Sequence, residues 1–134
     1  MICAELHGWV SIFSGQPLRK ISRSLAESSS SMKEHNAMSS LRANGFHQQA
    51  VGSLLGDSST SHGNDGCFDI CDEKDLILDG QFKLNELVVS VFLVNNELAW
   101  EISEKLQNFG TVFRGSIWPY ICSFYRGMNA FGEF

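Results

Sequence analysis

The chain has 134 residues, and its content of 43% hydrophobic and 11% aromatic residues is typical of a folded globular domain and argues against a disordered chain. The formal net charge of −5 disfavours nucleic acid and anionic membranes as partners, because phosphate binding requires clustered Lys and Arg. The same charge is compatible with a basic protein partner.

The N-terminal residues 1–15, MICAELHGWVSIFSG, lack the basic segment and the long apolar core of a secretory signal. No apolar run approaches the roughly 18 residues that a membrane helix needs. We therefore expect a cytoplasmic protein with no membrane association. Its four cysteines are then expected to be reduced thiols.

The first half of the chain contains one element that the pattern predicts as a strand and one that it predicts as a helix. Residues 5–13, ELHGWVSIF, are rich in β-branched and aromatic side chains, which favours a strand. Pro17 suits the first position of a helix, and Leu18, Ile21 and Leu25 follow at helical spacing. The serine run at residues 28–31 weakens this helix, since serine competes for backbone hydrogen bonds.

Residues 36–56 allow two interpretations. The Asn44-Gly45 pair favours a type I′ turn between two strands. The same glycine could instead end one helix before a second helix begins. The following segment, 56–66, has the composition of a loop.

The second half is predicted to be mostly strands. We expect strands at 67–71, at 76–84 around Asp79-Gly80, and at 86–94, where ELVVSVFLV is almost continuously apolar. A helix should follow, capped by Asn95 or Asn96 and ended by Gly110, with its apolar side chains at Leu98, Ile102, Leu106 and Phe109. Residues 111–125 return as one or two strands with a bend or edge at Pro119.

This order of elements predicts an α+β fold, in which two or three helices pack on a mostly antiparallel sheet. We expect a single domain over residues 1–134, with 22–40 and 56–66 as candidate flexible segments. No internal repeat is visible.

The densest polar segment is an acidic run at residues 65–79. It contains Lys74 and six acidic side chains, whereas residues 1–60 carry five basic and four acidic groups. One interpretation is an ordinary solvated turn. The other is an anionic patch that recruits a basic protein and raises the association rate. In the second interpretation the partner-binding residues are Asp65, Asp69, Asp72, Glu73, Asp75 and Asp79.

Cys67 and Cys71 in the same run give weaker support to metal or redox chemistry. Structural zinc sites use two cysteine or histidine pairs, and here a second pair beside Cys67, Cys71 and His62 is missing. On a strand the two cysteines would also lie about 13 Å apart. A redox pair would need a CxxC motif at a helix start. We therefore predict no metal and no cofactor, and we keep an enzyme that uses either cysteine as an alternative.

Two segments resemble a family of small bacterial immunity proteins that neutralise polymorphic or contact-dependent toxins. LHGWVSI, residues 6–12, is similar to the HGW first strand of that family. NGFHQ, residues 44–48, followed later by GCFDICDEKD, residues 66–75, looks like its strand that ends in acidic residues. The resemblance implies a small α+β cytoplasmic protein whose partner is a toxin domain. It also implies that Asp69, Asp72, Glu73 and Asp75 contact that partner.

A second resemblance is to the RNA-recognition motif. VSVFLVNNELAWEISEKLQNFGTVFRGSI, residues 89–117, looks like its first strand, first helix and second strand, and YRGMNAFGEF, residues 125–134, resembles its aromatic strand. The acidity of this half of the chain disfavours RNA binding. A small regulatory or RNA-binding module is therefore an alternative.

The leading prediction is a protein-binding inhibitor and not an enzyme. It would act as an immunity protein that covers the active or substrate-binding face of a basic toxin, with the acidic run competing for an anionic substrate.

Overall fold

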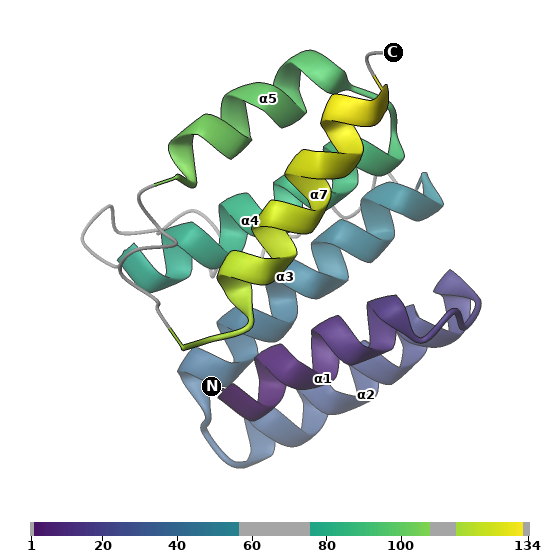
Figure 1. Ribbon diagram of the computed structural model, residues 1–134. Coiled ribbons are helices and arrows are strands. Elements are labelled where there is room, and N and C mark those ends of the chain that lie inside the picture. The colour runs from purple at the N-terminus through teal and green to yellow at the C-terminus, as the bar shows by residue number, and fades with distance from the viewer. Residues whose placement is uncertain (1, 57–75, 108–114, 133–134) are drawn as a thin grey trace. The chain divides into compact units, whose positions relative to one another are not determined.

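The computed structural model describes residues 2–56, 76–107 and 115–132, and all regular secondary structure in these residues is helical (Figure 1). The predicted α+β fold with an antiparallel sheet is therefore wrong, because the described residues form helices and no strand. The helices are α1 (Ile2–Phe13), α2 (Leu18–Glu34), α3 (Met38–Leu55), α4 (Leu76–Phe92), α5 (Asn96–Lys105) and α7 (Trp118–Gly132). The chain divides into two compact units, residues 1–78 and residues 79–134.

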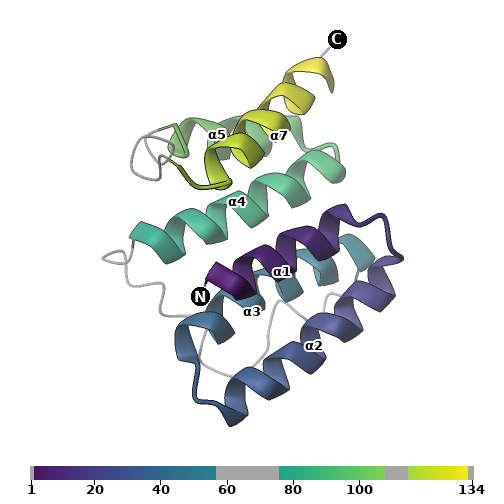
Figure 2. The same ribbon diagram turned by 60° about the horizontal axis from the view of Figure 1, so that its bottom comes forward.

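In the first unit, α1, α2 and α3 run antiparallel to one another in chain order, joined by short connections at 14–17 and 35–37 (Figures 1 and 2). Ile21, Leu25 and Val51 form its buried core, and partly buried side chains from all three helices pack around them, namely Ile12, Leu18 and Leu55. α3 packs against both α1 and α2, so it is buried on more than one side.

α1 corrects the first predicted strand. Ala4, Gly8 and Trp9 are buried, and Ile12 reaches the core, a spacing of four, five and eight residues that belongs to one side of a helix. The β-branched and aromatic content of residues 5–13 therefore did not decide the structure, because helical burial of these positions outweighs a propensity difference of about 1 kcal/mol.

α2 confirms the helix predicted after Pro17, which stands as the N-cap residue one position before the helix. The serine run lies inside this helix, where the Ser28 hydroxyl donates to the Ser24 carbonyl at 3.0 Å. Asn36 ends the helix with a left-handed φ of 53°. Its N–H donates to the Lys33 carbonyl and the Ala37 N–H donates to the Met32 carbonyl, which together form a Schellman motif.

α3 resolves the ambiguity over residues 36–56 as one continuous helix. Asn44-Gly45 lies in its interior, and both residues are buried. The Asn44 amide donates to the Leu25 carbonyl at 2.8 Å and to the Ser29 hydroxyl at 2.6 Å. These two bonds join α3 to α2, so the pair serves helix packing and not a hairpin turn.

In the second unit, α4 replaces the strands predicted at 76–84 and 86–94. Leu84, Leu87 and Val88 are buried at helical spacing, each at most 1% exposed. The resemblance to the RNA-recognition motif also placed a first strand from residue 89 onward. This is wrong as well, because residues 89–92 belong to α4. α4 ends in a second Schellman motif, in which Val94 has a left-handed φ of 57°. The Val94 N–H donates to the Val91 carbonyl, and the Asn95 N–H donates to the Ser90 carbonyl.

α5 confirms the helix predicted to be capped by Asn95 or Asn96, and Asn95 is the residue that caps it. The Asn95 side chain accepts from the Leu98 N–H at 3.3 Å, and the Lys105 ammonium donates to Glu101 at 2.6 Å. Ile102 and Leu106 are buried, whereas Leu98 is 42% exposed. The helix ends at Lys105, so the predicted end at Gly110 is wrong. Gly110 and Phe109 lie outside the described residues.

α7 corrects the last predicted strands over residues 118–125. Pro119 stands in the first turn of the helix, where its missing N–H leaves no hydrogen bond unmade. Trp118, Ile121, Tyr125 and Asn129 form its buried side. The Asn129 amide donates to the Asn96 carbonyl at 3.3 Å and so fixes the end of α7 to the start of α5.

Candidate binding surfaces

The structure describes only one residue of the predicted acidic contact surface. Asp65, Asp69, Asp72, Glu73 and Asp75 lie outside the described residues. Asp79 lies in the first turn of α4, where its carboxylate accepts from the Lys83 ammonium at 2.5 Å. This is a pair between neighbouring turns of one helix, so the described part of the acidic run is locally neutralised.

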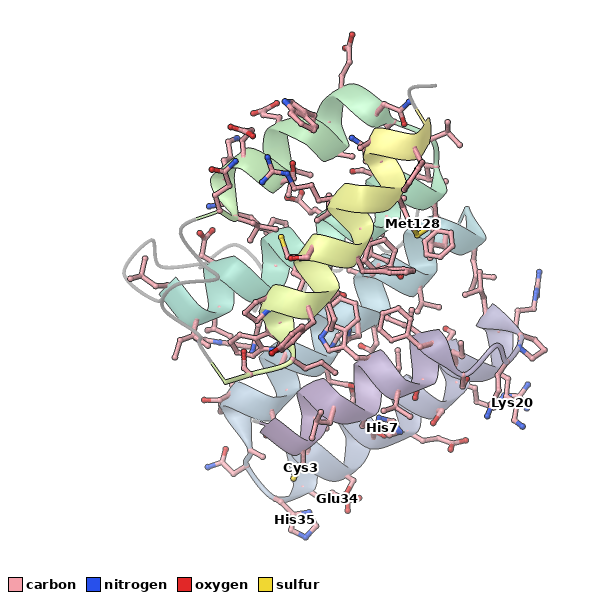
Figure 3. All side chains as sticks on the ribbon, viewed as in Figure 1. Cys3, His7, Lys20, Glu34, His35 and Met128 are labelled. Atoms are coloured by element: carbon pink, nitrogen blue, oxygen red, sulfur yellow. The ribbon has the colours of Figure 1, made fainter. Side chains whose placement is uncertain are left out.

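Cys67, Cys71 and His62 also lie outside the described residues. Cys3 is exposed on α1 and Cys122 is half-buried on α7. Within residues 2–56, 76–107 and 115–132, no three His, Cys, Asp or Glu side chains are grouped closely enough to hold a metal ion. Figure 3 shows Cys3 and His7 on α1 of the first unit.

The HGW segment is a packing site. Trp9 is 1% exposed, and its ring meets the His47 ring of α3 edge to face, with 4.9 Å between centroids. A Cβ on Gly8 would lie 2.1 Å from Cδ2 of His47, so only glycine permits this approach of the two helices. The strand that the immunity-protein resemblance placed here is instead the interior of a helix, and Trp9 belongs to the core.

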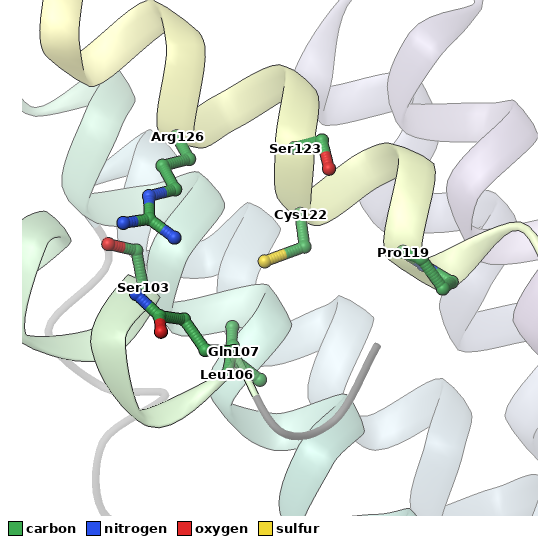
Figure 4. A pocket seen from close by; sticks show the side chains of 7 residues that line it. All are labelled: Ser103, Leu106, Gln107, Pro119, Cys122, Ser123 and Arg126. Carbon is green, nitrogen blue, oxygen red and sulfur yellow. The ribbon is translucent and has the colours of Figure 1, made fainter. Parts of the chain in front are cut away.

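A small pocket with a volume of about 340 Å³ lies between α5 and α7 of the second unit (Figure 4). Figure 4 shows the Cys122 thiol pointing into this space. The residues that line it are Ser103, Leu106, Gln107, Pro119, Cys122, Ser123 and Arg126.

The surroundings of the pocket disfavour the thiolate form of Cys122. Burial raises the pKa of the Cys122 thiol, and the nearby Arg126 charge lowers it by less. A protonated thiol is a weak nucleophile. Arg126 is itself engaged, because its guanidinium donates to Glu104 at 3.2 Å and lies 5.4 Å from the centre of the Trp100 ring.

The most distinctive surface of the second unit is apolar. Large apolar side chains are exposed along α7 and at the residue before it, and three more follow one another at the end of α4. We call these eight residues the apolar face: Phe92, Leu93, Val94, Ile117, Tyr120, Phe124, Met128 and Phe131.

The apolar face arises because α7 is hydrophobic on two adjacent sides. Successive helical residues are rotated by about 100°, so positions 117, 120, 124, 128 and 131 share one side and positions 118, 121, 125 and 129 share the next. The second side is buried. The first remains open, with Tyr120 74% exposed and Phe131 84% exposed. Met128, labelled on α7 in Figure 3, is 40% exposed.

The two parts of the apolar face are linked through one buried ring. The centre of the Tyr125 ring lies 6.0 Å from that of Phe92 and 5.2 Å from that of Phe124. The same burial raises the pKa of Tyr125 to about 12. Phe92 at the end of α4 and Phe124 of α7 therefore pack against the same buried ring.

No family model, no curated protein and no solved structure matches this chain. None of the helices in the described part of the chain has the length and apolar content to cross a membrane. The surfaces therefore have to be interpreted from their own geometry and chemistry.

Sequence reasoning missed the apolar face because it assigned residues 111–125 to strands. A signal was present: Ile117, Ile121, Phe124, Met128 and Phe131 are spaced by four, three, four and three residues, which is a helical repeat. A short apolar segment with Pro and aromatic residues favours either structure, and the prediction followed composition instead of spacing.

Proposed function

We propose that this protein acts by binding protein, and that the apolar face of the second unit is its contact surface. The observation that carries the proposal is the exposure of four aromatic side chains on one surface. Phe92, Tyr120, Phe124 and Phe131 are between 53% and 84% exposed. Aromatic residues are enriched in protein interfaces, where they supply much of the binding energy.

The size of the surface supports an interface. At about 200 Å² for a full aromatic side chain, these four residues expose roughly 500 Å². The largest apolar patch of a typical monomer is about 300–600 Å² and is often functional. The four aliphatic members of the face enlarge it further. Keeping such an area in water is unfavourable by about 25 cal/mol per Å², so a partner that covers it gains affinity.

The finer predictions from the sequence stay part of this proposal. In them the protein is a cytoplasmic inhibitor that occludes a basic toxin domain, and the acidic run contributes to contact. The resemblance that suggested immunity proteins implied an α+β fold, and the helical structure removes that support. Binding without catalysis remains the proposed mode of action, with no cofactor.

The test compares proteins retained by matched variants of the tagged full-length chain, including a differently tagged copy of the chain itself. Phe124→Glu places a charge on the apolar face, and Val10→Glu makes the same change at a 65% exposed apolar residue of α1. We expect Phe124→Glu to lose a protein that both the wild type and Val10→Glu retain. Retention by all three chains would refute the proposal.

The salt dependence of partner retention distinguishes the apolar face from the acidic run as the contact surface. Apolar contact should persist at high salt, whereas contact through exposed carboxylates should weaken. A chain with Asp69, Asp72 and Asp75 replaced by Lys tests the acidic run directly. If this variant loses the partner and Phe124→Glu keeps it, the acidic run and not the apolar face is the contact surface.

A further inference from the structure

Within α7, from Trp118 to Gly132, no charged residue lies on the same side of the helix as the apolar face. The nearest charge on α7 is Arg126, which lies on the opposite side of the helix and is bound to Glu104 and Trp100. Surfaces that select a different protein commonly use complementary charges around an apolar centre. In a two-fold symmetric interface a group close to the axis meets the same group of the other copy, so a charge there would be repelled, whereas a neutral apolar side chain would not.

We infer that the apolar face binds a second copy of this chain, in a two-fold symmetric dimer formed across α7. This inference rests on the proposed function and names its partner. The alternative partner is an apolar helix of another protein, and the experiment below distinguishes it from a second copy.

The area fits a dimer. A standard interface buries about 800 Å² on each partner. The four aromatic residues of the face supply roughly 500 Å² of this, at about 200 Å² for each full side chain. Leu93, Val94, Ile117 and Met128, which are 40–73% exposed, supply much of the remainder.

The geometry of α7 also fits pairing with itself. Phe124 lies midway between Ile117 and Phe131. A two-fold axis near Phe124 would therefore place the Ile117 end of one copy against the Phe131 end of the other. Gly127 lies about one turn further on, and a Cβ placed there would meet nothing within 4 Å. This open position leaves room for an aromatic side chain of the other copy, as in helix pairs whose axes approach to about 8–10 Å.

The experiment is sedimentation velocity of the purified full-length chain over a range of micromolar concentrations, in a reducing buffer that prevents disulfides through Cys3. We expect the wild type to shift from monomer to dimer as concentration rises. Phe124→Glu should raise the dissociation constant roughly tenfold or more, because it places a charge at the centre of the interface. Val10→Glu should dimerise like the wild type.

Gly127→Leu is the sharper variant, because it should leave the fold intact. Leucine favours a helix over glycine, and the space beside Gly127 is open in the monomer. In the dimer the added side chain would hold the two helices apart, so we expect a similar loss of affinity with unchanged helical content by circular dichroism.

Two results would overturn the inference: a wild type that stays monomeric, or a dimer whose affinity neither Phe124→Glu nor Gly127→Leu reduces. If the wild type is monomeric but retains another protein in a Phe124-dependent way, the inferred self-association is wrong and the proposed function stands. If Phe124→Glu changes neither self-association nor retention of another protein, both are wrong.

Discussion

Replacing Gly8 with alanine tests how α1 packs on α3. The new Cβ would lie 2.1 Å from Cδ2 of His47 and 2.5 Å from both Cγ and Nε2. Carbon atoms in contact are normally about 3.5–4.0 Å apart. The His47 ring is fully buried and packs edge to face against Trp9, so it has no solvent to move into. Either the ring or the whole helix has to shift.

Two opposing effects set the size of the change in stability. Inserting a methyl group into a packed core costs about 1–3 kcal/mol, and an overlap of roughly 1 Å or more with a buried ring places Gly8→Ala near the upper limit. Alanine is also a better helix former than glycine by about 1 kcal/mol. We therefore expect the free energy of unfolding to fall by about 2 kcal/mol.

The assay is urea unfolding followed by circular dichroism, with Gly127→Ala as the matched control. Both glycines lie inside helices, but a Cβ at Gly127 meets nothing within 4 Å. At a concentration at which the chain is monomeric, Gly127→Ala should therefore gain about 0.5–1 kcal/mol from helix propensity alone. The two identical changes should have opposite signs.

A double-mutant cycle isolates the clash. When His47→Ala removes the ring, adding Gly8→Ala should cost nothing further, because the methyl group then enters the vacated space. Gly8→Ala that is as stable as the wild type, or a penalty that persists without the His47 ring, would refute the packing argument.

Three further changes can be measured by the same unfolding assay. Val94→Asn should raise the free energy of unfolding by about 1 kcal/mol, since Val94 holds a left-handed φ of 57° that asparagine adopts at lower cost; no gain would mean that the strain at this turn is absent. Asn44→Ala should lower the free energy of unfolding by about 2 kcal/mol, because the buried amide donates to the Leu25 carbonyl and the Ser29 hydroxyl. An unchanged value would show that these hydrogen bonds make no net contribution. Burial raises the pKa of Tyr125 from 10.0 to about 12, so its contribution is complete below pH 10 and is lost as pH rises through 12. A decline over this range that persists unchanged in Tyr125→Phe would contradict the assignment.

Local signals predicted two helices correctly. α2 follows Pro17 and has its apolar residues at helical spacing, and α5 begins at an asparagine cap and contains the pair of Glu101 and Lys105. These features act between residues at most four positions apart, so they can be recognised in the sequence itself.

The strand predictions failed where composition and spacing disagreed. Residues 86–94 are rich in valine, which favours strands by less than about 1 kcal/mol per residue. Burying Leu84, Leu87 and Val88 on one side of a helix contributes about 1.5–3 kcal/mol for each side chain. Burial therefore outweighs propensity and decides the structure, but it depends on packing that no single segment contains.

The candidate contact surface, too, was determined in part by the sequence and in part by the tertiary structure. The sequence by itself determined the acidic balance, the capped helix at Asn95 and the apolar repeat of residues 117–131. Only the tertiary structure decided which side of α7 is buried and which stays open, because both sides are apolar. Burial depends on contacts between distant residues, such as those of Tyr125 with Phe92 and of Asn129 with Asn96.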